Sequence, residues 1–143
     1  MYLGSYQHQI DDKGRLSLPA PFRDRSGADE GMVLVHAFPD CLTLYPLATW
    51  ADVVTRLRER LRLEPEARPW VLRITSNAQE VSPDKQGRIL VPQRLQEAVG
   101  ISGAATVVGN IDRVEIWDPD RFAGMSDDIP EADASRLRHQ IFG

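Results

Sequence analysis

The stretch DDKGRLSLP at Asp11–Pro19 returns as DKQGRILVP at Asp84–Pro92, beginning 73 positions later. Both copies have the pattern Asp-x-x-Gly-Arg, followed by alternating residues and a proline. A second pair of matching stretches, at residues 40–45 and 112–117, is separated by 72 positions. Two blocks that recur in the same order predict two copies of one structural unit, joined head to tail.

Each repeated block is predicted to form a tight turn between two strands. In the first copy, residues 6–10 and 15–18 alternate apolar and polar side chains, which is typical of strands. Gly14 between them can adopt the positive φ that many hairpin turns require. Residues 6–18 are therefore predicted to form a hairpin with Lys13 and Gly14 at its tip.

The rest of the chain mixes helical and strand patterns. The longest predicted helix extends from about Leu47 to Leu63, where apolar residues recur at helical spacing. A second helical stretch is expected around Ala67–Ala78, and a short helix in the first copy is expected to end near Gly27. The acidic stretch Met125–Asp133 is expected to be mobile. Further strands are predicted at Met32–His36, Cys41–Tyr45, Glu80–Val81, Arg88–Val91, Ala105–Val108 and Val114–Trp117, and further helices at Pro92–Val99 and from Asp118 onward.

The repeat also predicts how the chain is organised. Each copy has roughly 45 residues, a size at which an isolated core is marginal, so the copies are expected to share a core or to oligomerise. The predicted parts are a first unit at residues 5–48, a helical connector at 49–76, a second unit at 77–121 and an acidic C-terminal tail at 122–143. The predicted fold class is α+β.

The composition is that of a soluble globular protein, with 42% hydrophobic and 27% charged residues. No run of about 18 apolar residues is present, and the N-terminus lacks a basic segment followed by an apolar one. Neither a membrane span nor a secretory signal is therefore predicted. The single cysteine, Cys41, cannot form an internal disulfide. A cytoplasmic location is the expectation.

The formal net charge of −4 is unevenly distributed along the chain. Residues 1–111 contain 13 basic and 13 acidic side chains, whereas residues 112–143 contain 4 basic and 8 acidic ones. A body with no net charge can still present a basic face, because attraction to phosphate depends on the local potential. The charge therefore neither predicts nor excludes a nucleic-acid partner.

Two interpretations fit the acid and the arginine of each turn. Asp11 and Arg15, like Asp84 and Arg88, lie on either side of a tight turn, where they can form a cross-strand ion pair that braces it. Exposed ion pairs stabilise a fold by only about 0–1 kcal/mol. The other interpretation is that the acid orients the guanidinium toward a phosphate or a guanine edge of DNA. The spacing leaves both open.

The neighbouring residues have ordinary explanations as well as functional ones. Gly14 and Gly87 are expected to serve the backbone of the turn. Lys13 and Lys85 lie at or near the tips, where a lysine suits a phosphate but is often only solvated. The arginines of Arg56–Arg62 form either a second phosphate-binding face or the solvated side of an amphipathic helix.

Enzymatic functions have little support in the sequence. His8, His36 and His139 lack metal-ligand spacing with one another or with Cys41, and no phosphate-binding loop motif is present. No catalytic residue, cofactor, metal or small-molecule substrate is therefore predicted. An enzyme on a small β fold that uses Asp11 or Cys41 remains an alternative.

The chain resembles the MraZ family of bacterial transcriptional regulators over about residues 1–122. The resemblance depends on residues 3–23, 41–46, 84–88 and 115–117. It implies two tandem, pseudo-symmetric swapped-hairpin units like those of the AbrB and MazE DNA-binding proteins, also called SpoVT-AbrB domains. It also implies a homo-oligomeric ring that binds repeated operator boxes in double-stranded DNA, ahead of the division and cell-wall gene cluster and its own gene. Such a protein is expected to be a repressor associated with the nucleoid.

The family motif falls on the two turns of this sequence. The second turn has Gln86 where the first has Lys13, so it offers one cation fewer at that position. A ring would raise the affinity of a weakly basic surface for DNA, because adjacent subunits would meet adjacent boxes at high effective concentration. An antitoxin-like module that captures a protein partner is the alternative, although the long disordered apolar tail expected for one is absent. The resemblance assigns DNA contact to Lys13, Arg15, Lys85 and Arg88, with Asp11, Gly14, Asp84 and Gly87 shaping the turns.

Overall fold

A computed structural model describes residues 1–23 and 31–143 of the protein. The strands are β1 (Ser5–Gln9), β2 (Arg15–Ser17), β3 (Met32–Phe38), β4 (Cys41–Pro46), β5 (Gln79–Val81), β6 (Arg88–Leu90), β7 (Ala104–Asn110) and β8 (Arg113–Trp117). The helices are α1 (Ala20–Arg23), α2 (Leu47–Leu63), η2 (Pro65–Ala67), α3 (Arg68–Asn77), α4 (Gln93–Ala98), α5 (Pro119–Met125), η3 (Ser126–Asp128) and α6 (Glu131–Phe142).

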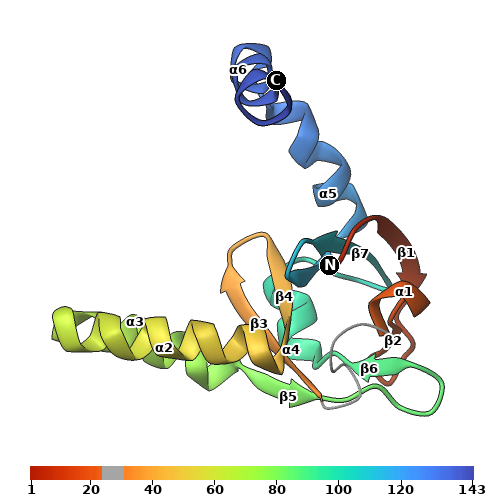
Figure 1. Cartoon of the computed structure of the whole chain (residues 1–143). Helices are drawn as coiled ribbons and strands as arrows, with labels where there is room; N and C mark the ends of the chain where they lie inside the picture. Colours follow the sequence, from red (N-terminus) through yellow and green to blue (C-terminus); the bar gives the residue numbers. More distant parts are fainter. Residues whose placement is uncertain (24–30) are drawn as a thin grey trace.

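Strands from the two copies are interleaved in one antiparallel sheet of six strands, in the order β1-β7-β8-β4-β3-β5 (Figure 1). β1 of the first copy pairs with β7 of the second, and β5 of the second copy pairs with β3 of the first. The strands β2 and β6, one from each copy, form a separate two-stranded sheet. The predicted α+β class is confirmed.

The predicted hairpin over residues 6–18 is wrong in its pairing. A turn does reverse the chain at residues 11–14, but the two arms contact each other only next to it, through the bridge between Ile10 and Leu16 and the hydrogen bonds between Asp11 and Arg15. Beyond that bridge, β1 and β2 enter different sheets and pair with strands of the second copy. Alternation of apolar and polar side chains predicts a strand but does not specify the strand with which it pairs. The hairpin prediction took the neighbouring strand in the sequence as the partner.

The larger of the two core clusters contains side chains from both copies, so the copies share a core, which is one of the two outcomes expected from the sequence. Side chains from both copies have almost no contact with solvent, and each contributes about 1.5–3 kcal/mol through burial. The β2–β6 sheet is fixed to this core by Leu16 and Ile89, which are fully buried. Other members are Leu34, Leu42, Val107 and Ile116.

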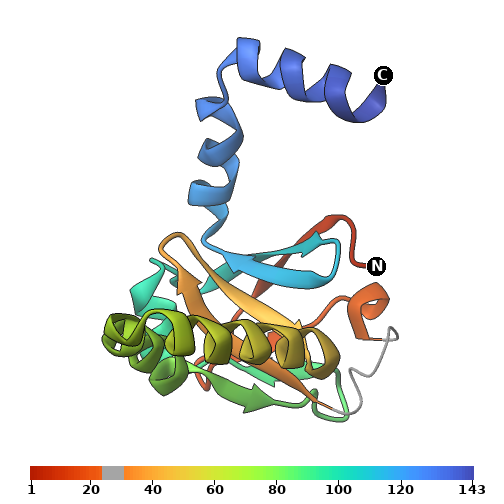
Figure 2. The ribbon, with the colours of Figure 1, turned by 60° about the vertical axis from the view of Figure 1, so that its left-hand side comes forward.

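The helices α2 and α3 form a hairpin that extends from one side of the body (Figures 1 and 2). The range predicted for α2, Leu47–Leu63, is confirmed: the helix follows Pro46 and stops before Pro65. Trp50 and Val53 of α2 pack against the small cluster formed by Val35, Tyr45 and Ile74. Among the described residues, no helix is long and apolar enough to cross a membrane.

The C-terminal part of the chain is helical. Asp118 accepts a hydrogen bond from the backbone N–H of Arg121 and so caps α5, which leads away from the sheets, and α6 turns off from its far end (Figure 2). Helices α5, η3 and α6 cover most of the stretch that was expected to be mobile. The predicted end of the first short helix, near Gly27, lies outside the described residues.

Candidate nucleic-acid interface

In the first turn, the Asp11 side chain organises the backbone and the arginine together. Its Oδ1 accepts hydrogen bonds from the backbone N–H groups of Lys13, at 3.0 Å, and Arg15, at 2.8 Å. Its Oδ2 accepts a hydrogen bond from Arg15 Nε, at 2.6 Å. The turn is closed by the backbone N–H of Gly14, which donates to the Asp11 carbonyl at 3.0 Å.

The second turn repeats this arrangement bond for bond. Asp84 Oδ1 accepts from the backbone N–H groups of Gln86 and Arg88, both at 2.9 Å, and Oδ2 accepts from Arg88 Nε at 3.0 Å. The backbone N–H of Gly87 donates to the Asp84 carbonyl at 2.9 Å. The repeated sequence pattern is therefore a repeated structural motif.

Both carboxylates are held in their charged form. The backbone N–H of Arg15 is the main cause that lowers the pKa of Asp11 below its ordinary value, and the Arg15 side chain adds to the effect. The backbone N–H of Arg88 does the same for the pKa of Asp84. At neutral pH each acid is an ionised acceptor that fixes the orientation of a permanently charged guanidinium.

Each arginine uses only part of its hydrogen-bonding capacity inside the protein. A guanidinium carries five N–H donors, and Asp11 and Asp84 engage only the Nε groups. Within residues 1–23 and 31–143, no hydrogen bond engages the Nη1 or Nη2 atoms of Arg15 or Arg88. Their side chains are 35% and 24% exposed, respectively. These Nη groups can therefore bind a ligand with acceptor oxygens.

The pairing of β2 with β6 places both arginines on one face. Arg15 lies opposite Leu90, and Arg88 lies opposite Ser17. Because strand side chains alternate between faces, these four side chains share one face, while the buried pair Leu16 and Ile89 occupies the other. Diagonal neighbours in such a ribbon are about 7–8 Å apart. The two arginines therefore extend from diagonally neighbouring positions on the outward face of one ribbon.

Each turn is locked by the opposite copy. The Gly14 carbonyl accepts a hydrogen bond from the Val91 backbone N–H at 2.7 Å, and the Gly87 carbonyl accepts one from the Leu18 backbone N–H at 2.9 Å. Gly14 and Gly87 have φ angles of 83° and 76°, which favour glycine. A Cβ at Gly14 would lie only 2.7 Å from the Val91 carbonyl oxygen. The two glycines are needed for the turn and for the close approach of the copies.

Two further residues next to the turns were missed in the sequence. Gln96 is buried, donates a hydrogen bond to the Val91 carbonyl at 2.9 Å and lies beside Gly14. Arg23 lies against Gly87, where its guanidinium occupies the space that a Cβ would need. The two residues are 73 positions apart, the spacing of the motif itself, so extending the repeat beyond its prolines would have identified them.

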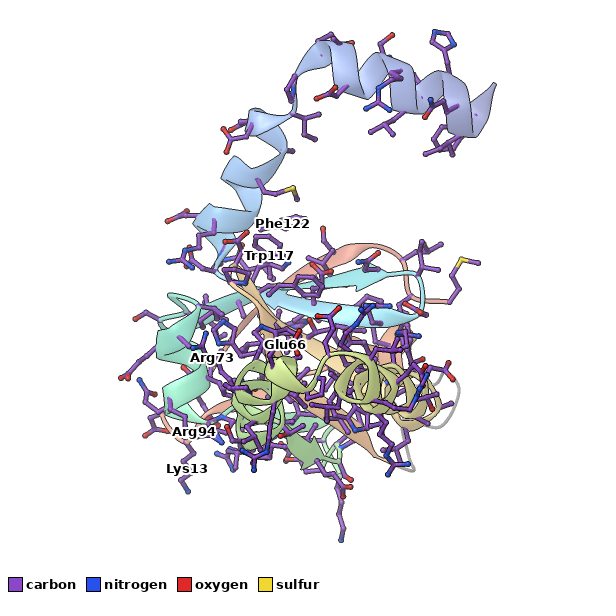
Figure 3. The ribbon with its side chains drawn as sticks, turned by 90° about the vertical axis from the view of Figure 1, so that its left-hand side faces the viewer. Lys13, Glu66, Arg73, Arg94, Trp117 and Phe122 are labelled. Atoms are coloured by element: carbon purple, nitrogen blue, oxygen red, sulfur yellow. The ribbon has the colours of Figure 1, made fainter. Side chains whose placement is uncertain are left out.

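The remaining cations lie at different places. Lys13 and Lys85 are exposed at their turns, and Figure 3 shows Lys13 and Arg94 extending from the same edge of the molecule in that view. The arginines of α2 are on the projecting hairpin, where Arg60 pairs with Glu64 and Arg62 pairs with Glu59. The structure therefore does not bring the α2 arginines into the β2–β6 ribbon.

The residues considered for catalysis lack an activated arrangement. Cys41 is buried, its thiol donates to Glu115 Oε1 at 3.7 Å, and desolvation raises its pKa to about 12. A thiol with such a pKa is not a nucleophile at neutral pH. In the described part of the chain, no three His, Cys, Asp or Glu side chains are grouped so that they could hold a metal ion. Asp11 is engaged by its own turn.

Comparison with known proteins places this chain among bacterial regulators. A family model described as "MraZ protein, putative antitoxin-like" matches residues 1–71 and 74–140. A protein of Desulfitobacterium hafniense named Transcriptional regulator MraZ is 41% identical over 135 residues, which are 94% of this chain and 93% of that protein. Proteins with the same name from Acetivibrio thermocellus (37% identical; 90% of this chain, 88% of that protein) and Herpetosiphon aurantiacus (34%; 97% and 96%) are also similar.

These relatives share one class, that of transcriptional regulators, and they match nearly the full length of the chain. The family match covers both copies of the turn motif. The chain belongs to the MraZ family.

Proposed function

We propose that the protein is a sequence-specific, double-stranded DNA-binding repressor that uses the β2–β6 ribbon as its reading element. The observation that supports this most is the placement of Arg15 and Arg88 on one outward face, each oriented by an aspartate of its own turn. An arginine that only stabilised its turn would need no more than the Nε bond to its aspartate. Arg15 and Arg88 both have Nη groups with no hydrogen bond among the described residues.

A two-stranded ribbon fits the major groove, which is about 12 Å wide. The Nη groups of Arg15 and Arg88 would donate to the O6 and N7 acceptors of guanine, the most common specific contact in such complexes. Lys13 and Lys85, exposed beside them, would neutralise phosphates. Asp11 and Asp84 would fix the direction of the arginines, so that little side-chain entropy is lost on binding.

The proposal extends to the assembly and its target. The two units, residues 5–48 and 77–121, would each be a swapped-hairpin domain, joined by the connector at 49–76. Copies of the chain would form a ring and bind repeated operator boxes ahead of the division and cell-wall gene cluster, including the promoter of its own gene. Multivalent binding would offset the net charge of −4, because one bound subunit places the next near its box. The protein would act in the cytoplasm, at the nucleoid.

An electrophoretic mobility shift with DNA from upstream of the gene tests this proposal. Arg15→Ala and Arg88→Ala together are expected to abolish the specific shift, while the far-ultraviolet circular dichroism spectrum stays unchanged. The control is Arg60→Ala with Arg62→Ala, which removes the same charge from α2. Unchanged affinity in the first variant would refute the assignment of the ribbon. An equal loss in the control would place the DNA on the helical hairpin instead.

A further inference from the structure

The last helix, α6, lacks a partner within the described chain. It has no buried residue, and its apolar side chains Ile141 and Phe142 are 69% and 84% exposed, with Leu137 also exposed. The base of the arm is anchored, because Phe122 of α5 packs edge-on against Trp117 at 5.7 Å between ring centroids (Figure 3). An isolated helix of 12 residues is marginal in water, so α6 needs a surface to bind.

An apolar groove lies on the α2–α3 hairpin. Its cavity has a volume of about 330 Å³. Two large apolar side chains of the hairpin, Leu63 and Trp70, are exposed as well. This hairpin is therefore too apolar at its far end to be explained as a purely solvated extension. The groove is lined by Leu61, Pro65, Arg68, Val71 and Leu72.

The arm and the hairpin have opposite charges. Residues 126–143, which include all of α6, contain four acidic side chains and two arginines, whereas residues 56–73 contain six arginines and three glutamates. Arg58, Arg68 and Arg73 take part in no ion pair among the described residues. The acidic residues lie before and at the start of α6, and Ile141 and Phe142 lie at its end, with Arg136 and Arg138 between them. Both ends of the helix could therefore contact the hairpin at the same time.

The two surfaces cannot easily meet within one chain. Figures 1 and 2 show the hairpin and the arm extending from different sides of the body. We propose that α6 of one copy docks in the α2–α3 groove of a second copy, with Leu137, Ile141 and Phe142 against the groove. Because the two contact surfaces differ, each copy would offer one of each, and such head-to-tail contacts form a ring when the rotation from one copy to the next closes. This inference deepens the ring assembly proposed above and does not depend on DNA contact by the arginines.

Disulfide trapping between two variants of the full chain, each with one added cysteine, tests the contact. Ile141→Cys and Leu72→Cys proteins, mixed and mildly oxidised, are expected to form a disulfide between the two variants. The native Cys41 does not interfere, because it is buried. The matched control is Ala132→Cys, nine residues before Ile141 and therefore on the opposite side of α6. Failure of Ile141→Cys to cross-link to Leu72→Cys, or an equal yield with Ala132→Cys, would overturn the proposal.

Native mass spectrometry of Ile141→Asp with Phe142→Asp gives a second, independent measurement. Neither residue belongs to the core, so the body is expected to fold normally. The assembly is expected to dissociate to smaller species, whereas Ala132→Asp leaves its mass unchanged. An undiminished assembly in the double variant would refute the contact. A DNA fragment with a single box distinguishes a failure of this proposal from a failure of the DNA-binding proposal. The double variant is expected to bind this fragment, whereas Arg15→Ala is expected to lose affinity for it.

Discussion

The turn at residues 11–15 and the turn at residues 84–88 have the same hydrogen bonds but different surroundings. The Arg15 Nε to Asp11 bond is 2.6 Å and the equivalent bond of Arg88 is 3.0 Å. The first turn packs against a buried amide, whereas the second packs against an arginine side chain. The groups that orient the guanidinium are thus identical in both turns, and the groups around them differ.

The difference also affects the distribution of charge. The first turn has Lys13 at the position where the second has Gln86, but the guanidinium of Arg23 lies against Gly87 of the second turn. Each turn thus keeps one lysine, Lys13 or Lys85, and Arg23 of the opposite copy adds a further cation beside the second turn. The comparison teaches that the interleaved fold, and not each turn alone, determines the local charge.

The largest effect is expected from Gly14→Ala. Alanine in the left-handed conformation costs about 1–2 kcal/mol, and the new Cβ would in addition press on the Val91 carbonyl, which cannot move freely. Gly87→Ala carries the same conformational cost, but it meets only the flexible side chain of Arg23. Chemical denaturation is expected to show a larger loss of stability for Gly14→Ala.

A third variant calibrates this comparison. Gly124→Ala lies in α5, where a Cβ meets no atom within 4 Å, and it is expected to stabilise the protein by up to about 1 kcal/mol. Equal losses for Gly14→Ala and Gly87→Ala would show that backbone conformation alone matters at the two turns.

The single variants Arg15→Ala and Arg88→Ala compare the two turns in DNA binding. Each is expected to lower affinity by about 1–3 kcal/mol per lost base contact, because an arginine engages a guanine through two donors. Fluorescence anisotropy with boxes substituted one base at a time is the measurement. Each variant is expected to lose discrimination at a different base. Loss at the same base in both would mean that the two turns do not read DNA separately.

Exchange of the differing tip residues is expected to have a smaller effect. Lys13→Gln removes a cation from the first turn and Gln86→Lys adds one to the second. A phosphate contact changes the slope of log affinity against log salt concentration by about 1. The slope is expected to become shallower in Lys13→Gln and steeper in Gln86→Lys. Identical slopes would show that these positions do not contact phosphate.

The smallest effect concerns acid titration of the two turns. The pKa values of Asp11 and Asp84 are both below the ordinary value of 3.8. Since folding lowers these pKa values, their contribution to stability is present above pH 3.8 and is lost as the pH falls through the folded-state values. Carboxyl chemical shifts measured by nuclear magnetic resonance are expected to titrate below pH 3.8 at both sites. Titration at or above 3.8 would contradict the hydrogen bonding described for the turns.

The parts of the fold that local chemistry determines could be predicted from the sequence. The extent of α2 follows from helical periodicity between two prolines, and the turns follow from Asp-x-x-Gly. The exchange of strands between copies could not be predicted, since alternation is the same whichever strand lies alongside. The contact of Arg23 with Gly87 was not predicted, because it joins the first copy to the second and depends on this exchange of strands. A weak amphipathic segment with Leu137, Ile141 and Phe142 was predicted, and it lies within α6, but the acidic stretch before it was wrongly expected to be mobile.

Photo-cross-linking from Leu90 tests the central claim most directly. Leu90 is 50% exposed and lies opposite Arg15 on the outward face of the β2–β6 ribbon. With benzoylphenylalanine at position 90, irradiation in the presence of DNA from upstream of the gene is expected to join protein to DNA. The same group at Leu63, a leucine of the α2–α3 hairpin that is 56% exposed, is expected to give no such product. A cross-link from position 63 and none from position 90 would contradict the account.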